Sequence, residues 1–129
     1  AKVDNVAYRL IKSHTPGPYT FILKATSEVP RRLLHAKRKT IGLRVPDNRI
    51  AQDMLGSLNE PIMSSTLILP GEDMPMTDPY EIRDLLGNQV DAVIDGGFCG
   101  MEETTIVDFT GDAPEVVREG AGIADWQQD

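Results

Sequence analysis

Lys39-Thr-Ile-Gly-Leu-Arg-Val-Pro46 is one of three short apolar runs that decide the fold of this chain. The others are Glu60-Pro-Ile-Met-Ser-Ser-Thr-Leu-Ile-Leu-Pro-Gly71 and Glu103-Thr-Thr-Ile-Val-Asp108, the latter followed by Val116-Val-Arg-Glu-Gly120. Each run favours a strand and carries an Arg or clustered hydroxyls near one end. Because an α/β sheet presents donors to an anionic ligand in this way, the pattern predicts a nucleotide- or phosphate-binding α/β domain.

The remaining elements follow from apolar spacing and from turn residues. Helical spacing begins near Val3 and stops before Pro16, and helices are also predicted at Arg31 to Lys37, Arg49 to Leu58 and after Asp78 up to Gly87. Strands are predicted at Tyr19 to Lys24, Thr40 to Val45, Ile62 to Leu69, Ala92 to Asp95, Thr104 to Phe109 and Glu115 to Arg118. This order predicts a twisted mixed sheet with flanking helices, in one domain over residues 1–129.

The composition places the chain among soluble proteins. Its 129 residues are 40% hydrophobic, which is enough for a core, and no run approaches the roughly 18 apolar residues of a membrane span. One cysteine, Cys99, cannot form an internal disulfide, so the cytoplasm is the expected compartment. The chain opens Ala1-Lys-Val-Asp-Asn5 on what reads as a helix already in progress, and we expect it to be truncated at the N-terminus.

Charge is divided unevenly along the chain. Residues 1–49 hold eleven Lys and Arg against three acids, whereas residues 50–129 hold two Arg against seventeen acids. The basic stretch is a candidate site for RNA or other phosphates, or else a solvated face or one that pairs with the acidic half. Its densest residues are Arg31, Arg32, Lys37, Arg38 and Lys39.

Several common active-site motifs are missing from the sequence. It has no phosphate-binding G-x-x-x-x-G-K-[ST] loop, no G-x-G-x-x-G fingerprint, no G-x-S-x-G elbow and no Cys pair. His14 and His35 lie far apart and show no partner for general-base work. We therefore assign no catalytic residue and no metal ligand from the sequence.

Polar residues in the apolar runs are the candidate ligands. Arg44 stands where a strand ends before a helix, so its guanidinium is suited either to clamp a phosphate or to form a surface ion pair, and Arg118 poses the same choice. Hydroxyl groups within a strand need partners, which a ligand or the neighbouring backbone supplies. These hydroxyls belong to Ser64, Ser65, Thr66 and Thr104.

The ordered set of these blocks resembles the YrdC/YciO-like family, which includes the threonylcarbamoyl-AMP synthases. The blocks are Pro16-Gly-Pro-Tyr-Thr-Phe-Ile-Leu23, Thr40-Ile-Gly-Leu-Arg-Val-Pro46, Pro61-Ile-Met-Ser-Ser-Thr66 with Leu69-Pro-Gly71, Val90-Asp-Ala-Val-Ile-Asp-Gly-Gly97, Glu103-Thr-Thr-Ile-Val-Asp108 and Val117-Arg-Glu-Gly120. The resemblance covers almost the whole chain and is strongest to the YciO branch. It implies a YrdC/RibB-like α/β fold with a concave, electropositive face.

The resemblance also implies a reaction. In the family, L-threonine captures bicarbonate, and the resulting N-carboxy-threonine attacks the α-phosphate of ATP, which arrives with Mg²⁺ and leaves as pyrophosphate and threonylcarbamoyl-adenylate. That adenylate supplies N6-threonylcarbamoyladenosine in transfer RNA. No tightly bound cofactor is implied, because positioning and anion clamps do much of this chemistry.

Matching motifs assign the family roles to residues of this chain. Arg44 corresponds to the Arg expected at the phosphates, and Thr66, Thr104 and Arg118 correspond to residues that line the nucleotide. Ser64 and Ser65 lie in the same nucleotide block as Thr66. Pro18 and Thr20 correspond to the block beside the threonine pocket.

Two departures from the family pattern leave three interpretations open. Ile68 stands where the synthases have Asn, and the family's N-terminal block has no counterpart in residues 1–129. The first interpretation is a truncated YciO-like protein that binds ATP and is inactive alone, although the full-length protein forms the adenylate. The second is a non-catalytic module that binds double-stranded RNA or transfer RNA, and the third is a product without a role of its own whose exposed strand edges self-associate.

Overall fold

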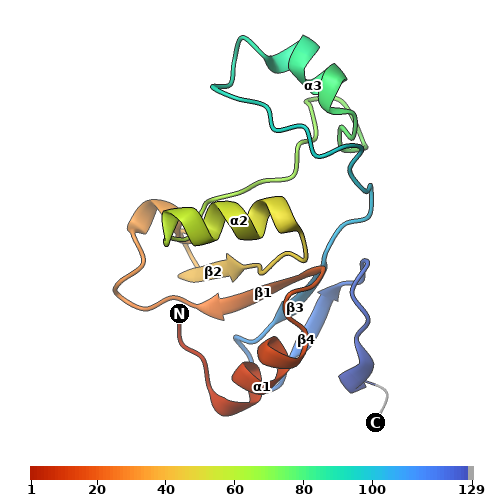
Figure 1. The fold of residues 1–129 in the computed structure, drawn as a ribbon. Coiled ribbons are helices and arrows are strands. Elements are labelled where there is room, and N and C mark those ends of the chain that lie inside the picture. The colour runs from red at the N-terminus through yellow and green to blue at the C-terminus, as the bar shows by residue number, and fades with distance from the viewer. Residues whose placement is uncertain (128–129) are drawn as a thin grey trace. The chain divides into compact units, whose positions relative to one another are not determined.

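The computed structural model describes residues 1–127, whose elements fall into two compact units (Figure 1). The first unit combines Ala1–Asn48 with the residues from Glu103 onward, and the second is Arg49–Glu102. Most long-range strand pairing belongs to the first unit. The prediction of one domain over the whole chain stays a prediction.

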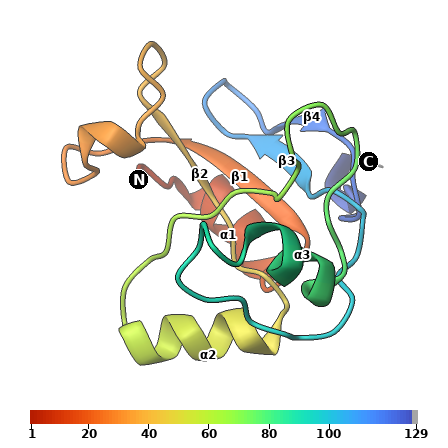
Figure 2. The ribbon, with the colours of Figure 1, turned by 90° about the horizontal axis from the view of Figure 1, so that it is seen from above.

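A four-stranded mixed sheet forms the centre of the first unit, as predicted. Its strands are β1 (Tyr19–Lys24), β2 (Thr40–Leu43), β3 (Thr105–Asp108) and β4 (Glu115–Arg118). Figure 2 shows them in the order β2-β1-β3-β4. The central pair, β1 and β3, is parallel, and both outer pairs are antiparallel.

One face of this sheet carries the core. Side chains alternate between the two faces of a strand, and in β1 the residues Tyr19, Phe21 and Leu23 are buried while those between them are partly exposed. Tyr19 and Phe21 form a cluster with the fully buried Val107 of β3. Helix α1 (Asn5–Ser13) contributes Ile11 to the edge of that cluster.

Local signals set the limits of α1. The Asp4 carboxylate accepts a hydrogen bond from the backbone N–H of Ala7 at 2.8 Å, which satisfies one of the free donors of the first turn. Ala7 is buried, whereas Val6 and Tyr8 on either side of it are exposed. The helix ends before the Pro16-Gly-Pro18 stop that the sequence predicts.

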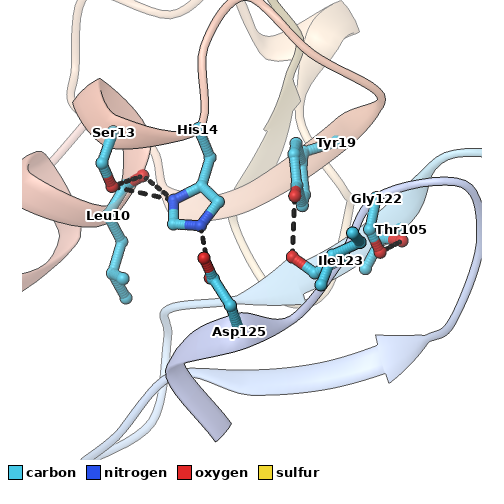
Figure 3. Close-up of polar contacts among 8 residues, drawn as sticks. All are labelled: Leu10, Ser13, His14, Tyr19, Thr105, Gly122, Ile123 and Asp125. Atoms are coloured by element: carbon cyan, nitrogen blue, oxygen red, sulfur yellow. Dashed lines mark hydrogen bonds and ion pairs between the residues drawn. The ribbon is translucent and has the colours of Figure 1, made fainter. Parts of the chain in front are cut away.

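The segment after β4 returns to the core and is fastened by three side-chain bonds (Figure 3). His14 Nε2 lies 2.7 Å from Asp125 Oδ1, the Tyr19 hydroxyl donates to the Ile123 carbonyl at 2.7 Å, and the Thr105 hydroxyl donates to the Gly122 carbonyl at 2.6 Å. The hydrogen bond from His14 lowers the pKa of Asp125, and burial raises the pKa of Tyr19. The segment ends in a single turn of 3₁₀ helix, η2 (Asp125–Gln127).

The second unit contains two of the predicted helices, α2 (Arg49–Leu58) and α3 (Pro79–Leu86). Asp78 caps α3 by accepting a hydrogen bond from the Tyr80 N–H at 3.0 Å, and Pro79 occupies the first turn, where its missing N–H costs nothing. The N–H of Gly87 bonds to the Arg83 carbonyl at 2.9 Å and closes the helix. Both ends of α3 were predicted from the sequence.

Two predicted strands are wrong. Residues 62–69 and 92–95 form no strand in the described part of the second unit. A strand needs a partner strand for its backbone groups as well as β-prone residues. Here the Leu67 carbonyl accepts a hydrogen bond from the Met76 N–H in an irregular loop instead. A run of β-prone residues therefore predicts a strand only where a partner strand is also available.

The basic helix predicted at Arg31 to Lys37 is shorter than expected. Only η1 (Arg31–Leu33) forms, because Leu34 already has extended backbone angles. The chain then turns back into β2, and the His35 carbonyl accepts from the N–H of Lys39 at 3.0 Å. Lys39 has a positive φ of 56°, which this tight turn requires.

Candidate functional site

The pairing of the strands brings four of the predicted sequence blocks to one end of the sheet. Since β1 and β3 are parallel and their outer partners antiparallel, β1 and β3 begin where β2 and β4 end. The N–H of Gly17 bonds to the Val45 carbonyl at 2.9 Å, and the N–H of Thr105 bonds to the Pro18 carbonyl at 3.0 Å. Residues distant in sequence are therefore held side by side by the backbone alone.

Three predicted ligand residues meet at this end, on the face opposite the core. The hydroxyl oxygens of Thr20 and Thr104 lie 2.7 Å apart. Arg118 donates from Nε to the Thr104 carbonyl at 3.0 Å and from Nη2 to the Thr104 hydroxyl at 2.9 Å. We call Thr20, Thr104 and Arg118 the threonine–arginine cluster.

The guanidinium of Arg118 retains donors for a ligand. Its side chain is 38% exposed, and two of its five N–H groups are used by Thr104. Its Nη1 atom lies 3.6 Å from Glu103 Oε2, an ion pair between half-exposed groups that water screens. An Arg held in a fixed orientation with free N–H groups is suited to bind a phosphate or carboxylate.

Glycine at position 120 allows the chain to close behind this cluster. A Cβ atom there would lie 2.6 Å from the carbonyl carbon and oxygen of Thr104, and nearer still to the Glu103 oxygen. The N–H of Gly120 bonds to the Thr105 hydroxyl at 3.0 Å, and that side chain is fully buried. Gly120 is thus needed for close backbone approach.

Arg44 extends the same end of the sheet. It directly precedes Val45, whose carbonyl bonds to Gly17, and it is exposed. Among the described residues no ion pair within 4.0 Å engages its guanidinium. A role for Arg44 at the phosphates stays a prediction, as does the role of the exposed Pro18.

The hydroxyl run Ser64, Ser65 and Thr66 belongs to the second unit and is exposed. Ser65 donates to the Thr66 carbonyl at 3.4 Å, the local partner that the sequence left open as an alternative. Ile68 is 37% exposed. A role for this run in nucleotide binding stays a prediction.

The basic residues lie in the connection between β1 and β2. All five of them are exposed: Arg31, Arg32, Lys37, Arg38 and Lys39. Near them, the face of the sheet opposite the core has a hollow of about 370 Å³. We call this face the open face. It is lined by Ile22, Lys24, Arg38, Thr40, Asp108 and Thr110.

Sequence reasoning missed Glu103, Gly120 and the hollow. Glu103 and Gly120 belong to two of the quoted blocks. A linear pattern does not show that the backbone at Gly120 approaches the carbonyl groups of Glu103 and Thr104. Lys24 and Asp108 end two strands that pair in parallel, and alternation along each strand was the signal that could have placed them on one face.

Residues 1–127 contain neither a metal-binding cluster nor a membrane-spanning helix. No group of three or more His, Cys, Asp and Glu side chains there is placed to hold a metal ion. No helix in that range is long and apolar enough to cross a membrane. Cys99 is exposed and free.

Solved structures of two relatives share this fold. The crystal structure of Escherichia coli YciO is 60% identical in sequence, with a TM-score of 0.87 over 94% of this chain and 59% of that chain. The crystal structure of Pyrococcus abyssi Sua5 complexed with L-threonine is 26% identical, with a TM-score of 0.81 over 93% of this chain and 35% of that one. These matches confirm the α/β fold class predicted from the sequence.

Sequence comparisons give the same relationship. An uncharacterized protein of Haemophilus influenzae is 60% identical over 95% of this chain, and the threonylcarbamoyl-AMP synthase of P. abyssi is 28% identical over 92% of it. The chain spans 59% of the first relative's length and 35% of the second's. The Sua5/YciO/YrdC family, whose description reads "Telomere recombination", matches residues 1–120. The chain therefore belongs to the Sua5/YciO/YrdC family, as the resemblance of its sequence blocks predicted.

Proposed function

We propose that the full-length protein binds ATP and forms threonylcarbamoyl-AMP from L-threonine and bicarbonate in the cytoplasm. The observation that carries this proposal is the threonine–arginine cluster, in which Thr104 fixes the Arg118 guanidinium by two hydrogen bonds on the open face of the sheet. Relationship to proteins named threonylcarbamoyl-AMP synthases supports it, and so does the solved complex of one of them with L-threonine.

In this proposal the chain's own residues bind and orient the reactants. Arg118 directs its free N–H groups at the nucleotide, and Arg44 binds the phosphates at the adjoining strand end. The two cations favour the charge that grows on the phosphates when the carbamate oxygen attacks the α-phosphorus and pyrophosphate departs. Thr20, whose hydroxyl lies 2.7 Å from that of Thr104, contacts the threonine substrate in this proposal, the role that the family resemblance gives it.

Mg²⁺ enters with ATP in this proposal, as an ion bound to the substrate phosphates. Such an ion keeps several waters and binds mainly through phosphate oxygens. A nucleotide role for the hydroxyl run Ser64, Ser65 and Thr66 is part of the proposal only through the family resemblance of its sequence block, in which Ile68 stands where the synthases have an amide.

Mass spectrometry for threonylcarbamoyl-AMP tests the proposal. ATP, L-threonine and bicarbonate are incubated with the chain, with its full-length form and with Arg44→Ala and Arg118→Lys variants of that form. Product is expected from the unsubstituted full-length form, falling at least about tenfold in either variant, since a lost charged hydrogen bond costs about 1.5–3 kcal/mol. Arg9→Gln, on the exposed side of α1, is the control and keeps full activity. Absence of product from a folded, ATP-binding full-length form contradicts the proposal.

A second candidate function, binding of double-stranded or transfer RNA, is favoured by a separate observation. Arg31, Arg32, Lys37, Arg38 and Lys39 are all exposed in one connection, and none of them forms an ion pair within 4.0 Å among residues 1–127. Cations free of carboxylate partners are available to phosphates. RNA binding that weakens steeply with salt, without adenylate formation, is the expected result for this function alone.

A further inference from the structure

The hollow of about 370 Å³ lies on the open face of the sheet, at the end opposite the threonine–arginine cluster. Lys24 is the last residue of β1 and pairs with Thr40, the first residue of β2. Asp108 is the last residue of β3 and pairs with Ile22 of β1. Alternation along β1 turns Ile22 and Lys24 away from the core that Phe21 and Leu23 form.

Two cations at the hollow have no acidic partner. No carboxylate oxygen among residues 1–127 lies within 4.0 Å of the charged nitrogens of Lys24 or Arg38. The hydroxyl of Thr40 lines the same hollow. A loop hydrogen bond holds Arg38 in place, because its backbone N–H donates to His35 Nδ1 at 3.2 Å.

The one carboxylate at the hollow is half engaged. Asp108 Oδ1 accepts from both the N–H and the hydroxyl of Thr110, at 2.8 and 2.6 Å. The structure describes no partner for Oδ2 within residues 1–127. A carboxylate oxygen with free lone pairs accepts a hydroxyl, so the hollow combines an acceptor with an anion-binding pair.

We propose that this hollow binds one ribose–phosphate unit of an RNA strand. Lys24 and Arg38 bind the phosphate, and Asp108 accepts a hydrogen bond from the 2′-hydroxyl, the group that distinguishes RNA from DNA. The volume suits a ligand of this size. The proposal rests on the second candidate function and gives it a defined site.

The surroundings favour a polyanion over a free nucleotide. Arg38 belongs both to the hollow and to the exposed basic connection, so neighbouring phosphates of the same strand reach Arg31, Arg32, Lys37 and Lys39. These contacts add counterion release, which a single nucleotide cannot provide. Aromatic residues are few, with three Phe, three Tyr and one Trp, so backbone contacts outweigh base stacking.

Fluorescence anisotropy with an RNA hairpin and a DNA hairpin of the same sequence tests the site in the full-length protein. Lys24→Gln and Arg38→Gln are each expected to lower RNA affinity about three- to tenfold and to reduce the salt slope by about 0.7–0.9, the value of one phosphate contact. Asp108→Asn keeps an oxygen for Thr110 but removes the charged acceptor, so the preference for RNA over DNA falls toward one. Arg9→Gln, on α1 against the opposite face, is the control and changes neither quantity.

Three results would overturn the site. The first is unchanged affinity and salt slope in both cation variants, measured on protein whose circular dichroism matches the parent. The second is equal affinity of the unsubstituted protein for the RNA and DNA hairpins. The third is binding of adenosine monophosphate by protein that binds neither hairpin, which assigns the hollow to a free nucleotide. Adenylate formation is measured separately, so loss of the hairpin site leaves the proposed synthesis standing, and the reverse also holds.

Discussion

Substitution of Gly120 by alanine tests whether close backbone approach holds the threonine–arginine cluster together. The added Cβ would lie 2.6 Å from the carbonyl carbon and oxygen of Thr104, and these are backbone atoms that cannot rotate away. Overpacking of this kind costs about 1–3 kcal/mol. The strand ends must separate, which weakens the bonds from Gly120 N–H to the Thr105 hydroxyl and from Ala121 N–H to the Glu103 carbonyl.

Each weakened hydrogen bond adds at most about 1 kcal/mol to the overpacking cost. We therefore expect Gly120→Ala to lower the free energy of unfolding of the first unit by about 2–4 kcal/mol. Trp126 is the single tryptophan and packs against the core of that unit, so its fluorescence during urea denaturation reports on the relevant element. The same variant should bind ATP more weakly, because Thr104 orients Arg118.

Gly111→Ala is the matched control. It lies in the turn between β3 and β4, and a Cβ atom there would have no heavy atom within 4 Å. We expect its stability to stay within about 0.5 kcal/mol of the parent. If the two variants unfold at the same urea concentration, the close approach of Gly120 does not constrain the fold and the reasoning is refuted.

Two further predictions concern the core and the fastening of the C-terminal segment. Phe21 is 2% exposed, so Phe21→Ala should lower the free energy of unfolding by about 3–5 kcal/mol in the same Trp126 assay. Tyr8 is 56% exposed, so Tyr8→Ala should lower it by less than about 1 kcal/mol. Equal losses in the two variants would contradict the assigned core. The hydrogen bond from His14 lowers the pKa of Asp125 in the folded state. The stability that this bond gives the fold is therefore present above the pKa of Asp125 in the unfolded chain, about 3.9, and is lost as pH falls through its lower pKa in the folded state. The stability difference between the parent and Asp125→Asn should then shrink steadily as pH falls below about 3.9, and a difference that stays constant there argues against the fastening.

Local chemistry made some elements predictable from the sequence. The cap at Asp78, the proline after it and the closing Gly87 set both ends of α3 without reference to the rest of the chain. Alternation did the same for β1, where buried and half-exposed residues follow each other. Residues 62–69 carry an equally strong β-prone pattern and yet form no strand, because pairing depends on a neighbour that the pattern does not contain.

The candidate site was predictable only in its residue types. Arg118 and Thr104 were selected as polar residues beside apolar runs, and Thr20 was selected through the family resemblance, but the contacts among them join residues up to 84 positions apart. No spacing along one strand contains that information. The hollow was missed for the same reason, since Lys24 and Asp108 meet only through the parallel pairing of β1 with β3.

That parallel pairing connects the stability of the chain to its proposed chemistry. The register that places Phe21 opposite Val107 in the core also directs Thr20 and Thr104 to the open face. Because side chains alternate strictly, a slip of one residue in β3 would exchange the two sets, exposing the core and burying the ligand residues. Hydrophobic burial on one face therefore selects the arrangement of donors on the other. A substitution that loosens the core, such as Phe21→Ala, should for this reason impair ligand binding without touching the open face.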